Sequence, residues 1–240
     1  MRISLTLTLL IFINNVLICQ DFKYIKPDLG DSCEIISSIS DTAEMYEQLV
    51  FIDYKKDSKL KRSLADFKLT DSRINQIRDS YNRIQEKSDN SSSKHEYNLP
   101  NNWIKIHKYR GEWILYDDIE FNSRYILSDT ALISFFMDGT YAEPLIDFKS
   151  KDKKYKFKFA SLSWDDSQSI SEHKLDIKII DPQLLIAIWR FESDGSIYYN
   201  FMIPEKNKEM FPIIGIITTD LMGNESNILD SVDFEEIFKK

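Results

Sequence analysis

The side chains that most often carry chemistry in proteins are few and scattered in this sequence. The three histidines are His95, His107 and His173, and no two of them have the four-residue spacing that presents two metal ligands on one helix face. His95-Glu96 also lacks the second histidine of a zinc-protease helix. We therefore expect no metal site, and we interpret the histidines as solvated or hydrogen-bonded residues.

Motifs for phosphates and for serine nucleophiles are not found either. Phosphate-binding loops need clustered glycines, because backbone amides must approach the phosphate closely, and the turn that exposes the serine of many hydrolases needs them too. The 6 glycines of this chain are Gly30, Gly111, Gly139, Gly195, Gly215 and Gly223. Because they are far apart, we expect no nucleotide cofactor and no serine nucleophile of this kind.

Carboxylates are the remaining residues with catalytic chemistry. Asp117-Asp118, Glu120 and Asp165-Asp166 follow segments with a strand pattern, where two of them could meet as the acid and base of a glycosidase. Adjacent aspartates in a strand point to opposite sides, and acidic pairs at strand ends usually belong to turns. We favour the interpretation as turn residues, so the sequence assigns no catalytic, cofactor-binding or metal-binding residue.

The first residues indicate export. Met1-Arg2 is a short basic start, and the apolar run that follows from Ile3 to Ile13 is too short to span a membrane. We predict a signal peptide over residues 1–19 with cleavage after Cys19, which leaves Cys33 as the single thiol and excludes an internal disulfide. Acylation of Cys19, which would anchor the protein to a membrane, is an alternative, and a buried N-terminal strand is a less favoured one.

Composition indicates a folded, acidic protein. Charged residues make up 29% and hydrophobic residues 42% of the chain, values near the averages of globular proteins. The 31 basic and 39 acidic residues give a net charge of −8, which disfavours nucleic acid and anionic membranes as partners. Low glycine and proline counts with abundant isoleucine, lysine and asparagine suggest a bacterial envelope or secreted protein.

The first part of the mature chain has helical spacing. We predict helices over residues 41–56, 58–67 and 71–87, the last with Ile74, Ile77, Tyr81 and Ile84 on one face. Residues 88–100 are polar and without periodicity, which is typical of a linker. Residues 20–100 are therefore expected to form a helical region that ends in a polar linker over 88–100.

After Pro100 the apolar residues alternate with polar ones. Segments 103–107, 155–159 and 175–179 have this period of two, and Asp138-Gly139 and Asp194-Gly195 each separate two such runs as expected for tight hairpins. Leu184–Phe191 is apolar on both faces, which indicates a central strand. We predict an antiparallel meander from about 103 to 203.

Other segments complete the second domain, residues 101–240. The basic run Lys149–Lys154 is interpreted as a solvated hairpin tip. Phe211–Ile217 is a further apolar run, and Phe234–Phe238 is expected to be a short terminal helix. The predicted fold class is α+β: an N-terminal helical region followed by an antiparallel β-meander that forms a barrel or a strongly curved sheet.

Two segments resemble bacterial lipocalin-like domains. Tyr109–Leu115 contains Gly111-Glu112-Trp113, similar to the Gly-x-Trp opening strand of that family, and Phe136–Tyr141 is similar to a hairpin that recurs in it. The resemblance covers residues 103–203 and implies an up-and-down barrel with Trp113 closing one end. It also implies structural roles for Gly111 and Trp113, and a stacking role for Arg190.

These observations favour an exported, non-catalytic β-domain protein that binds a small apolar ligand or a protein partner. An immunity-type or interaction-type envelope protein with an acidic binding surface is one alternative, and a hydrolase that uses strand-end carboxylates is a less favoured one. A cavity inside the barrel would favour ligand binding, whereas a filled barrel with an exposed apolar or acidic patch would favour the interaction protein. The sequence leaves the ligand, the partner and the oligomeric state open.

Overall fold

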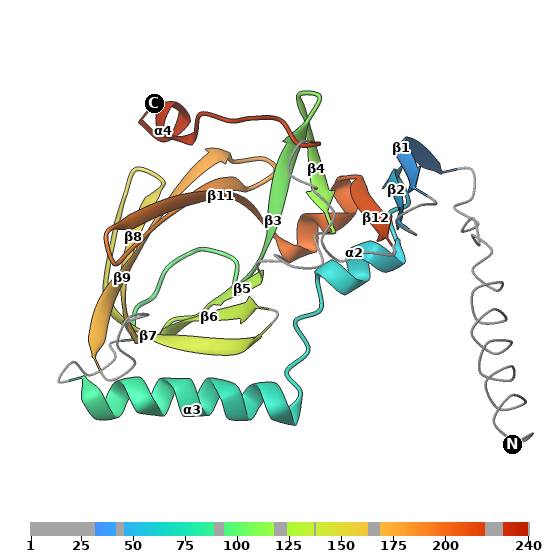
Figure 1. The fold of residues 1–240 in the computed structure, drawn as a ribbon. Coiled ribbons are helices and arrows are strands. Elements are labelled where there is room, and N and C mark those ends of the chain that lie inside the picture. Colours follow the sequence, from blue (N-terminus) through green and yellow to red (C-terminus); the bar gives the residue numbers. More distant parts are fainter. Residues whose placement is uncertain are drawn as a thin grey trace, which may run out of the picture. The chain divides into compact units, whose positions relative to one another are not determined.

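Figure 1 shows the fold, which is that of a computed structural model. The structure describes residues 32–41, 46–88, 94–117, 124–136, 138–162, 169–218 and 228–239. The chain divides into two compact units, residues 1–31 and 32–240, and all described residues belong to the second. The predicted signal peptide and its cleavage site lie outside the described residues.

Eight antiparallel strands close into a barrel (Figure 1). The strands are β3 (Asn102–Tyr109), β5 (Arg124–Leu127), β6 (Ala131–Phe136), β7 (Gly139–Lys151), β8 (Lys154–Leu162), β9 (Ile170–Asp181), β10 (Ile186–Ser193) and β11 (Ser196–Pro204). From β5 to β11 each strand pairs with the next one in the chain, and β3 pairs with both β5 and β11. The expected meander is confirmed, and its two edges meet on β3.

Four more strands extend the sheet from the second half of β3, which leaves the barrel and pairs with β4 (Glu112–Tyr116). β4 pairs in parallel with β12 (Ile213–Thr218), which pairs in turn with β2 (Tyr46–Asp53). The last strand is β1 (Cys33–Asp41), which pairs with β2. Most of the apolar run 211–217 thus forms β12, the strand between β4 and β2.

The predicted helix over residues 41–56 is wrong, because β1 and β2 are strands. Leu49, Val50, Phe51 and Ile52 are all buried, since β2 is covered on both faces. A short run of apolar residues in such a strand has no period of two and is easily taken for part of a helix. Within the described part of 20–100, the helix expected over 58–67 is shorter than predicted, and the strands β1 and β2 mean that this region is not mainly helical.

Two of the predicted N-terminal helices are confirmed as α2 (Lys59–Leu64) and α3 (Asp71–Lys87). The Thr70 hydroxyl accepts a hydrogen bond from the Arg73 amide at 3.3 Å and caps α3. Ile84 is the one side chain of α3 that is fully buried, so the helix rests on the barrel with little apolar contact. The expected terminal helix is α4 (Phe234–Lys239), and a 3₁₀ helix, η1, spans Glu205–Met210.

The core has three parts, which follow from the alternation of side chains along the strands. The inner faces of the barrel strands carry the first, which includes Trp103, Phe157 and Trp189, each at most 1% exposed. The second lies outside β3, β10 and β11 and packs against α2, β12 and α4. The third lies among β2, β3, β4 and β12. β10 contributes to the first two parts, so the predicted central strand over 184–191 is confirmed.

The two Asp-Gly turns have different outcomes. Asp194 and Gly195 have φ values of 48° and 79° and join the paired residues Ser193 and Ser196, as expected for a two-residue turn. The other hairpin turns one residue earlier than predicted, because Gly139 pairs with Phe136 and is the first residue of β7. The side chains of the tip between β7 and β8, Lys149–Lys154, are exposed, which confirms the interpretation of that basic run.

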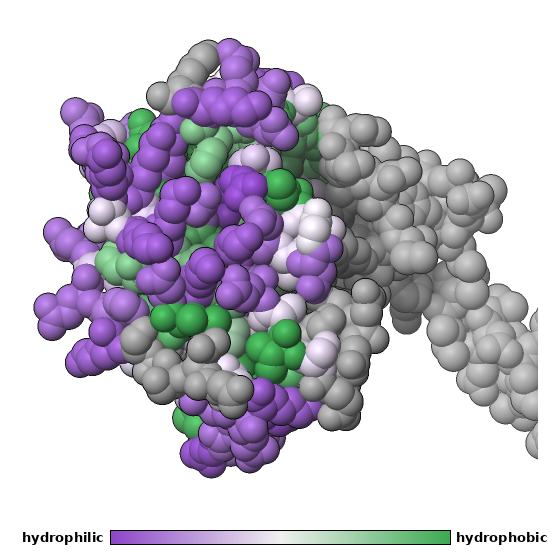
Figure 2. Space-filling model, turned by 90° about the vertical axis from the view of Figure 1, so that its left-hand side faces the viewer, coloured by the Kyte–Doolittle hydropathy of each residue, from purple (hydrophilic) through white to green (hydrophobic). Residues whose placement is uncertain are grey.

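The outer face over β8 and β9 is mostly hydrophilic (Figure 2). Lysines of β8 lie beside carboxylates of β9, with Lys158 at 3.2 Å from Glu172 and Lys156 at 3.9 Å from Asp176. Arg190 of β10 adds contacts with Asp176 at 3.7 Å and with Glu192 at 2.9 Å. This charged face is that of an ordinary solvated sheet.

Candidate functional site

One end of the barrel is covered by the segment that precedes β3. Tyr97 and Leu99 of this segment pack against the inner core, and the Tyr97 ring lies 5.3 Å from Phe148 and 5.2 Å from Phe157. The Tyr97 hydroxyl donates a hydrogen bond to the Ser128 carbonyl. We call this end, where residues 94–101 cross the strands, the closed end.

The opposite end is where β6 joins β7 and where β10 joins β11, and we call it the mouth. Phe136, Tyr141 and Tyr198 belong to strand ends at the mouth and are 43%, 40% and 42% exposed. Their rings connect to buried aromatics: Phe136 is 6.5 Å from Tyr125, and Tyr198 stacks on Phe191 at 4.7 Å. A continuous aromatic surface therefore runs from the rim of the mouth into the core.

An ion pair is buried beside these rings. Nδ1 of His173 on β9 lies 2.8 Å from Oε2 and 3.1 Å from Oε1 of Glu143 on β7. The two side chains are only 10% and 13% exposed, so the pair is largely withdrawn from water. The His173 ring also packs 5.5 Å from that of Phe191. A carboxylate and an imidazole thus face each other in an interior that is otherwise mostly apolar.

The electrostatics of the pair favour a charged imidazole. Desolvation by itself lowers the pKa of His173, but the Glu143 carboxylate outweighs it and Asp194 acts in the same direction, so the pKa of His173 is raised. Desolvation, followed by the nearby Tyr125 and Glu143, raises the pKa of the Tyr198 phenol, which therefore keeps its proton. The mouth thus carries a phenol donor at Tyr198 and an imidazole at His173 whose protonation is favoured by Glu143.

Some buried polar atoms near this pair have no hydrogen-bond partner. They include Nε2 of His173, Oγ of Ser171 and Nε1 of Trp189. Ser171 and His173 are two residues apart on β9 and therefore point to the same side of the sheet, toward the barrel interior. A buried polar atom without a partner is costly in free energy, so its presence needs an explanation, of which a functional role is one.

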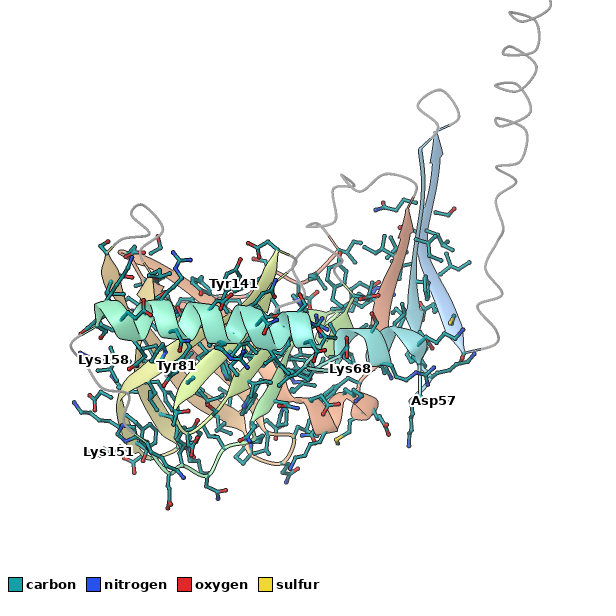
Figure 3. All side chains as sticks on the ribbon, turned by 90° about the horizontal axis from the view of Figure 1, so that it is seen from below. Asp57, Lys68, Tyr81, Tyr141, Lys151 and Lys158 are labelled. Carbon is teal, nitrogen blue, oxygen red and sulfur yellow. The ribbon has the colours of Figure 1, made fainter. Side chains whose placement is uncertain are left out.

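Helix α3 supports the strand that carries Glu143. β7 and β8 pair only from Leu145 and Phe159 onward, so the first part of β7 is not paired with β8. Instead, the amides of Thr140 and Ala142 donate to Oε1 of Gln76 at 3.1 Å and to Oγ of Ser80 at 2.9 Å. Figure 3 shows α3 lying across the strands at this position. The helix takes the place of a strand partner next to Glu143.

The two other histidines lie away from the mouth. His107 packs 5.6 Å from Tyr116 in the sheet extension, where desolvation and then Lys105 lower its pKa to about 3. His95 lies 5.8 Å from Phe148 at the closed end. His173 is hydrogen-bonded, as predicted, but the sequence interpretation did not recognise its partner Glu143.

Most of the carboxylates weighed as catalytic residues cannot be placed. Asp118, Glu120, Asp165 and Asp166 lie outside the described residues. The Asp117 amide donates to the Ile214 carbonyl at 2.9 Å, which places it where β4 meets β12, outside the barrel. Cys33 is a free, half-buried cysteine at the start of β1.

Trp113 and Arg190 do not have the roles that the lipocalin-like resemblance implied. Trp113 is on β4, outside the barrel, where its ring contacts Phe201 at 4.8 Å and lies 4.1 Å from Nζ of Lys108. Arg190 is held by Asp176 and Glu192. The tryptophan inside the first barrel strand is Trp103, which contacts Trp189 at 5.3 Å. Gly111 is structural, with a φ of 81° in the turn between β3 and β4.

Two surface grooves lie elsewhere on the protein. One at the closed end has a volume of about 670 Å³ and is lined by Asn98, Leu99, Tyr155, Ile179 and Lys206, among others. A second one of about 450 Å³ lies between the hairpin of β3 and β4 and the segment before α4. Neither holds a buried polar atom without a partner.

No family model, no curated protein and no solved structure matches this chain. Within the described ranges, no group of three or more histidine, cysteine, aspartate or glutamate side chains is arranged to hold a metal ion. The helices of the described residues are all too short or too polar to cross a membrane.

Proposed function

We propose that this protein is a non-catalytic binding protein whose barrel mouth holds a small ligand with an aromatic group. The observation that carries the proposal is the Glu143–His173 pair, which is buried among aromatic rings and leaves Nε2 of His173 without a partner. A buried ion pair contributes little to stability compared with apolar side chains of the same size. Its presence in a barrel core therefore supports a functional role.

The packing of the barrel decides where a ligand would bind. The inner core residues, from Trp103 to Met202, are at most 2% exposed, so they leave no room for a ligand deep in the barrel. A filled barrel weakens the expectation of an enclosed cavity for an apolar ligand. The exposed rings of Phe136, Tyr141 and Tyr198 are the apolar surface that a ligand at the mouth would contact.

Binding is favoured over catalysis by the contacts of His173. A histidine whose Nδ1 faces a carboxylate is the arrangement of a general base that activates a serine. Ser171 is nearby on the same strand, but its Oγ and Nε2 of His173 do not hydrogen bond to each other. A catalytic site of this kind needs a hydrogen bond between the serine hydroxyl and Nε2 of the histidine, and Ser171 and His173 do not form one.

We also infer that the barrel follows the lipocalin-like plan. The support is the order of its strands along the chain and the burial of Trp103 on the first of them. Export to the cell envelope or the medium belongs to the same proposal and rests on residues 1–19 alone. Sequencing the N-terminus of the protein from its native host tests this: a start at Gln20 supports it, and a start at Met1 contradicts it.

Calorimetric titration with small aromatic compounds tests the binding function. We expect saturable binding that is weakened by Phe136→Ala or Tyr198→Ala. Tyr54→Ala is the matched control, because Tyr54 is 51% exposed but follows β2, far along the sheet from the barrel. An equal loss of affinity in Tyr54→Ala would contradict binding at the mouth. If no aromatic compound binds in a saturable way, the proposal is wrong, and an interaction protein that contacts a partner through the same rings is favoured.

A further inference from the structure

We propose that the ligand of the mouth is an uncharged aromatic molecule with a carbonyl oxygen that accepts a hydrogen bond from Nε2 of His173. This inference rests on the proposed function and specifies the chemistry of its ligand. It combines three features of the mouth: a buried donor, a set of charges that excludes ions, and exposed aromatic rings.

The first feature is the donor. Glu143 occupies Nδ1 of His173, so a proton lies between these two atoms and fixes the orientation of the ring. Nε2 is farther from the backbone than Nδ1, and because His173 points inward, Nε2 is directed toward the barrel axis. This nitrogen is buried and has no partner in the protein. The Glu143 carboxylate favours the protonated imidazole, in which Nε2 also carries a proton and needs an acceptor.

A second donor lies next to it. The Ser171 hydroxyl has no partner, is buried, and belongs to the same face of β9 two residues nearer the mouth. A carbonyl oxygen has two lone pairs and can accept from both groups at once. A ligand without an acceptor would leave both buried donors unpaired on binding, which costs affinity.

The charges around the pair decide between an anion and a neutral acceptor. The charges of His173 and Glu143 cancel, and Asp194 interacts with His173 from the turn between β10 and β11. Asp138 adds a further carboxylate, which accepts a hydrogen bond from the Tyr141 hydroxyl at 3.2 Å. Arg124 at the start of β5 is turned outward and donates to the carbonyls of Ser63 and Asp66. The described charges at the mouth therefore sum to a negative value, which repels an anion.

A cationic ligand is disfavoured for a different reason. An ammonium group has no lone pair, so it cannot accept from Nε2 of His173, and it is repelled by the protonated form of the imidazole, which Glu143 favours. An uncharged carbonyl compound satisfies the donors without either repulsion. Its aromatic part would pack against the exposed rings of Phe136, Tyr141 and Tyr198.

Four naphthalene compounds with the same ring and similar side chains separate these possibilities. They are 1-naphthaleneacetamide, 1-naphthaleneacetate, 2-(1-naphthyl)ethylamine and 1-ethylnaphthalene, measured by calorimetry on the full protein. We expect the acetamide to bind roughly tenfold more tightly than ethylnaphthalene, which is the ratio that one hydrogen bond to a charged group gives. We expect the acetate and the amine to bind more weakly than the acetamide.

A pair of variants assigns this preference to His173. Glu143→Leu with His173→Phe replaces the ion pair by apolar groups, so ethylnaphthalene should still bind while the tenfold preference for the acetamide falls to the smaller part that the Ser171 hydroxyl contributes. His173→Gln, which keeps an N–H donor, should retain part of the preference and serves as the second variant if the double variant fails to fold. Lys158→Gln with Glu172→Gln removes an ion pair from the outer face and is the control that should leave the preference unchanged.

The outcomes distinguish this inference from the proposed function. If none of the four compounds binds in a saturable way, the proposed function is wrong, and the inference falls with it. If ethylnaphthalene or the acetate binds as tightly as the acetamide, the mouth binds aromatic ligands but the inference is wrong. A preference of undiminished size in the double variant would likewise contradict the role of His173.

Discussion

His173 on β9 and Glu143 on β7 are joined by a contact of 2.8 Å that passes across the inner face of β8. Phe159 of β8 pairs with both Leu145 and His173, so the ion pair lies at the level where β7 and β8 separate. The pair therefore links two strands at a position where the backbone hydrogen bonds of the barrel are incomplete. We therefore expect changes to the pair to alter the stability of the barrel.

Stability should fall as pH rises through the pKa of His173. Its folded pKa is raised above the unfolded value of 6.5, so protonation stabilises the folded state fully below about pH 6.5. This contribution is lost as pH rises through the folded pKa. Urea unfolding from pH 6 to 9 should show the decline in the native protein but not in His173→Gln. A decline of the same size in the variant would assign it to other groups.

Removing one member of the pair should be costlier than removing both. His173→Phe leaves Glu143 buried without its partner, for which we expect a loss of about 3–5 kcal/mol. Glu143→Leu with His173→Phe replaces the pair by apolar side chains and should be less destabilised than His173→Phe alone. Unfolding free energies of the single and double variants measure this, and strictly additive losses would contradict the coupling.

Helix α3 should stabilise β7 through two hydrogen bonds. Gln76→Ala and Ser80→Ala each remove an acceptor for a β7 amide, at Thr140 and at Ala142, and we expect each to cost about 1 kcal/mol. Asn82→Ala, on the exposed side of α3, is the control and should change stability little. Denaturant midpoints give the result, and an equal loss of stability in all three variants would contradict a specific role of the two hydrogen bonds, since alanine raises helix propensity at each position.

The turn at Gly195 should tolerate only residues that accept a positive φ. Its φ is 79° and an added Cβ would meet no atom within 4 Å, so any loss of stability comes from the backbone. We expect Gly195→Val to cost on the order of 1–3 kcal/mol and Gly195→Asn to cost much less. An unchanged thermal midpoint for Gly195→Val would contradict the turn.

Local patterns predicted the barrel strands and the later helices well. Alternation along 175–179 and the Asp194-Gly195 pair identify strands and a hairpin because these signals depend only on neighbouring residues. They could not predict that β3 pairs with both β5 and β11, since closure depends on residues far apart in the chain. The same limit hid β2, whose burial comes from contacts made by β12 and α2, and β1, which is a strand because it pairs with β2.

The candidate site was only partly visible in the sequence. His173 is two residues before Leu175 and four before Ile177, so it lies on the same inner face of β9 as these apolar residues. Extending the alternation of 175–179 by two residues would have shown this. Glu143 is 30 residues away on another strand, so no spacing rule pairs the two. The resemblance around Trp113 pointed to the wrong strand, because the hairpin of β3 and β4 leaves the barrel.

The most direct test of the account is to map where 1-naphthaleneacetamide binds by nuclear magnetic resonance. Titration of the isotope-labelled protein should shift signals of Phe136, Tyr141, His173 and Tyr198, with contacts between the ligand and these side chains. It should leave the closed end, including Leu99, Tyr155 and Ile179, unchanged. Shifts confined to the groove at the closed end, or none at saturating ligand, would contradict a binding site at the mouth.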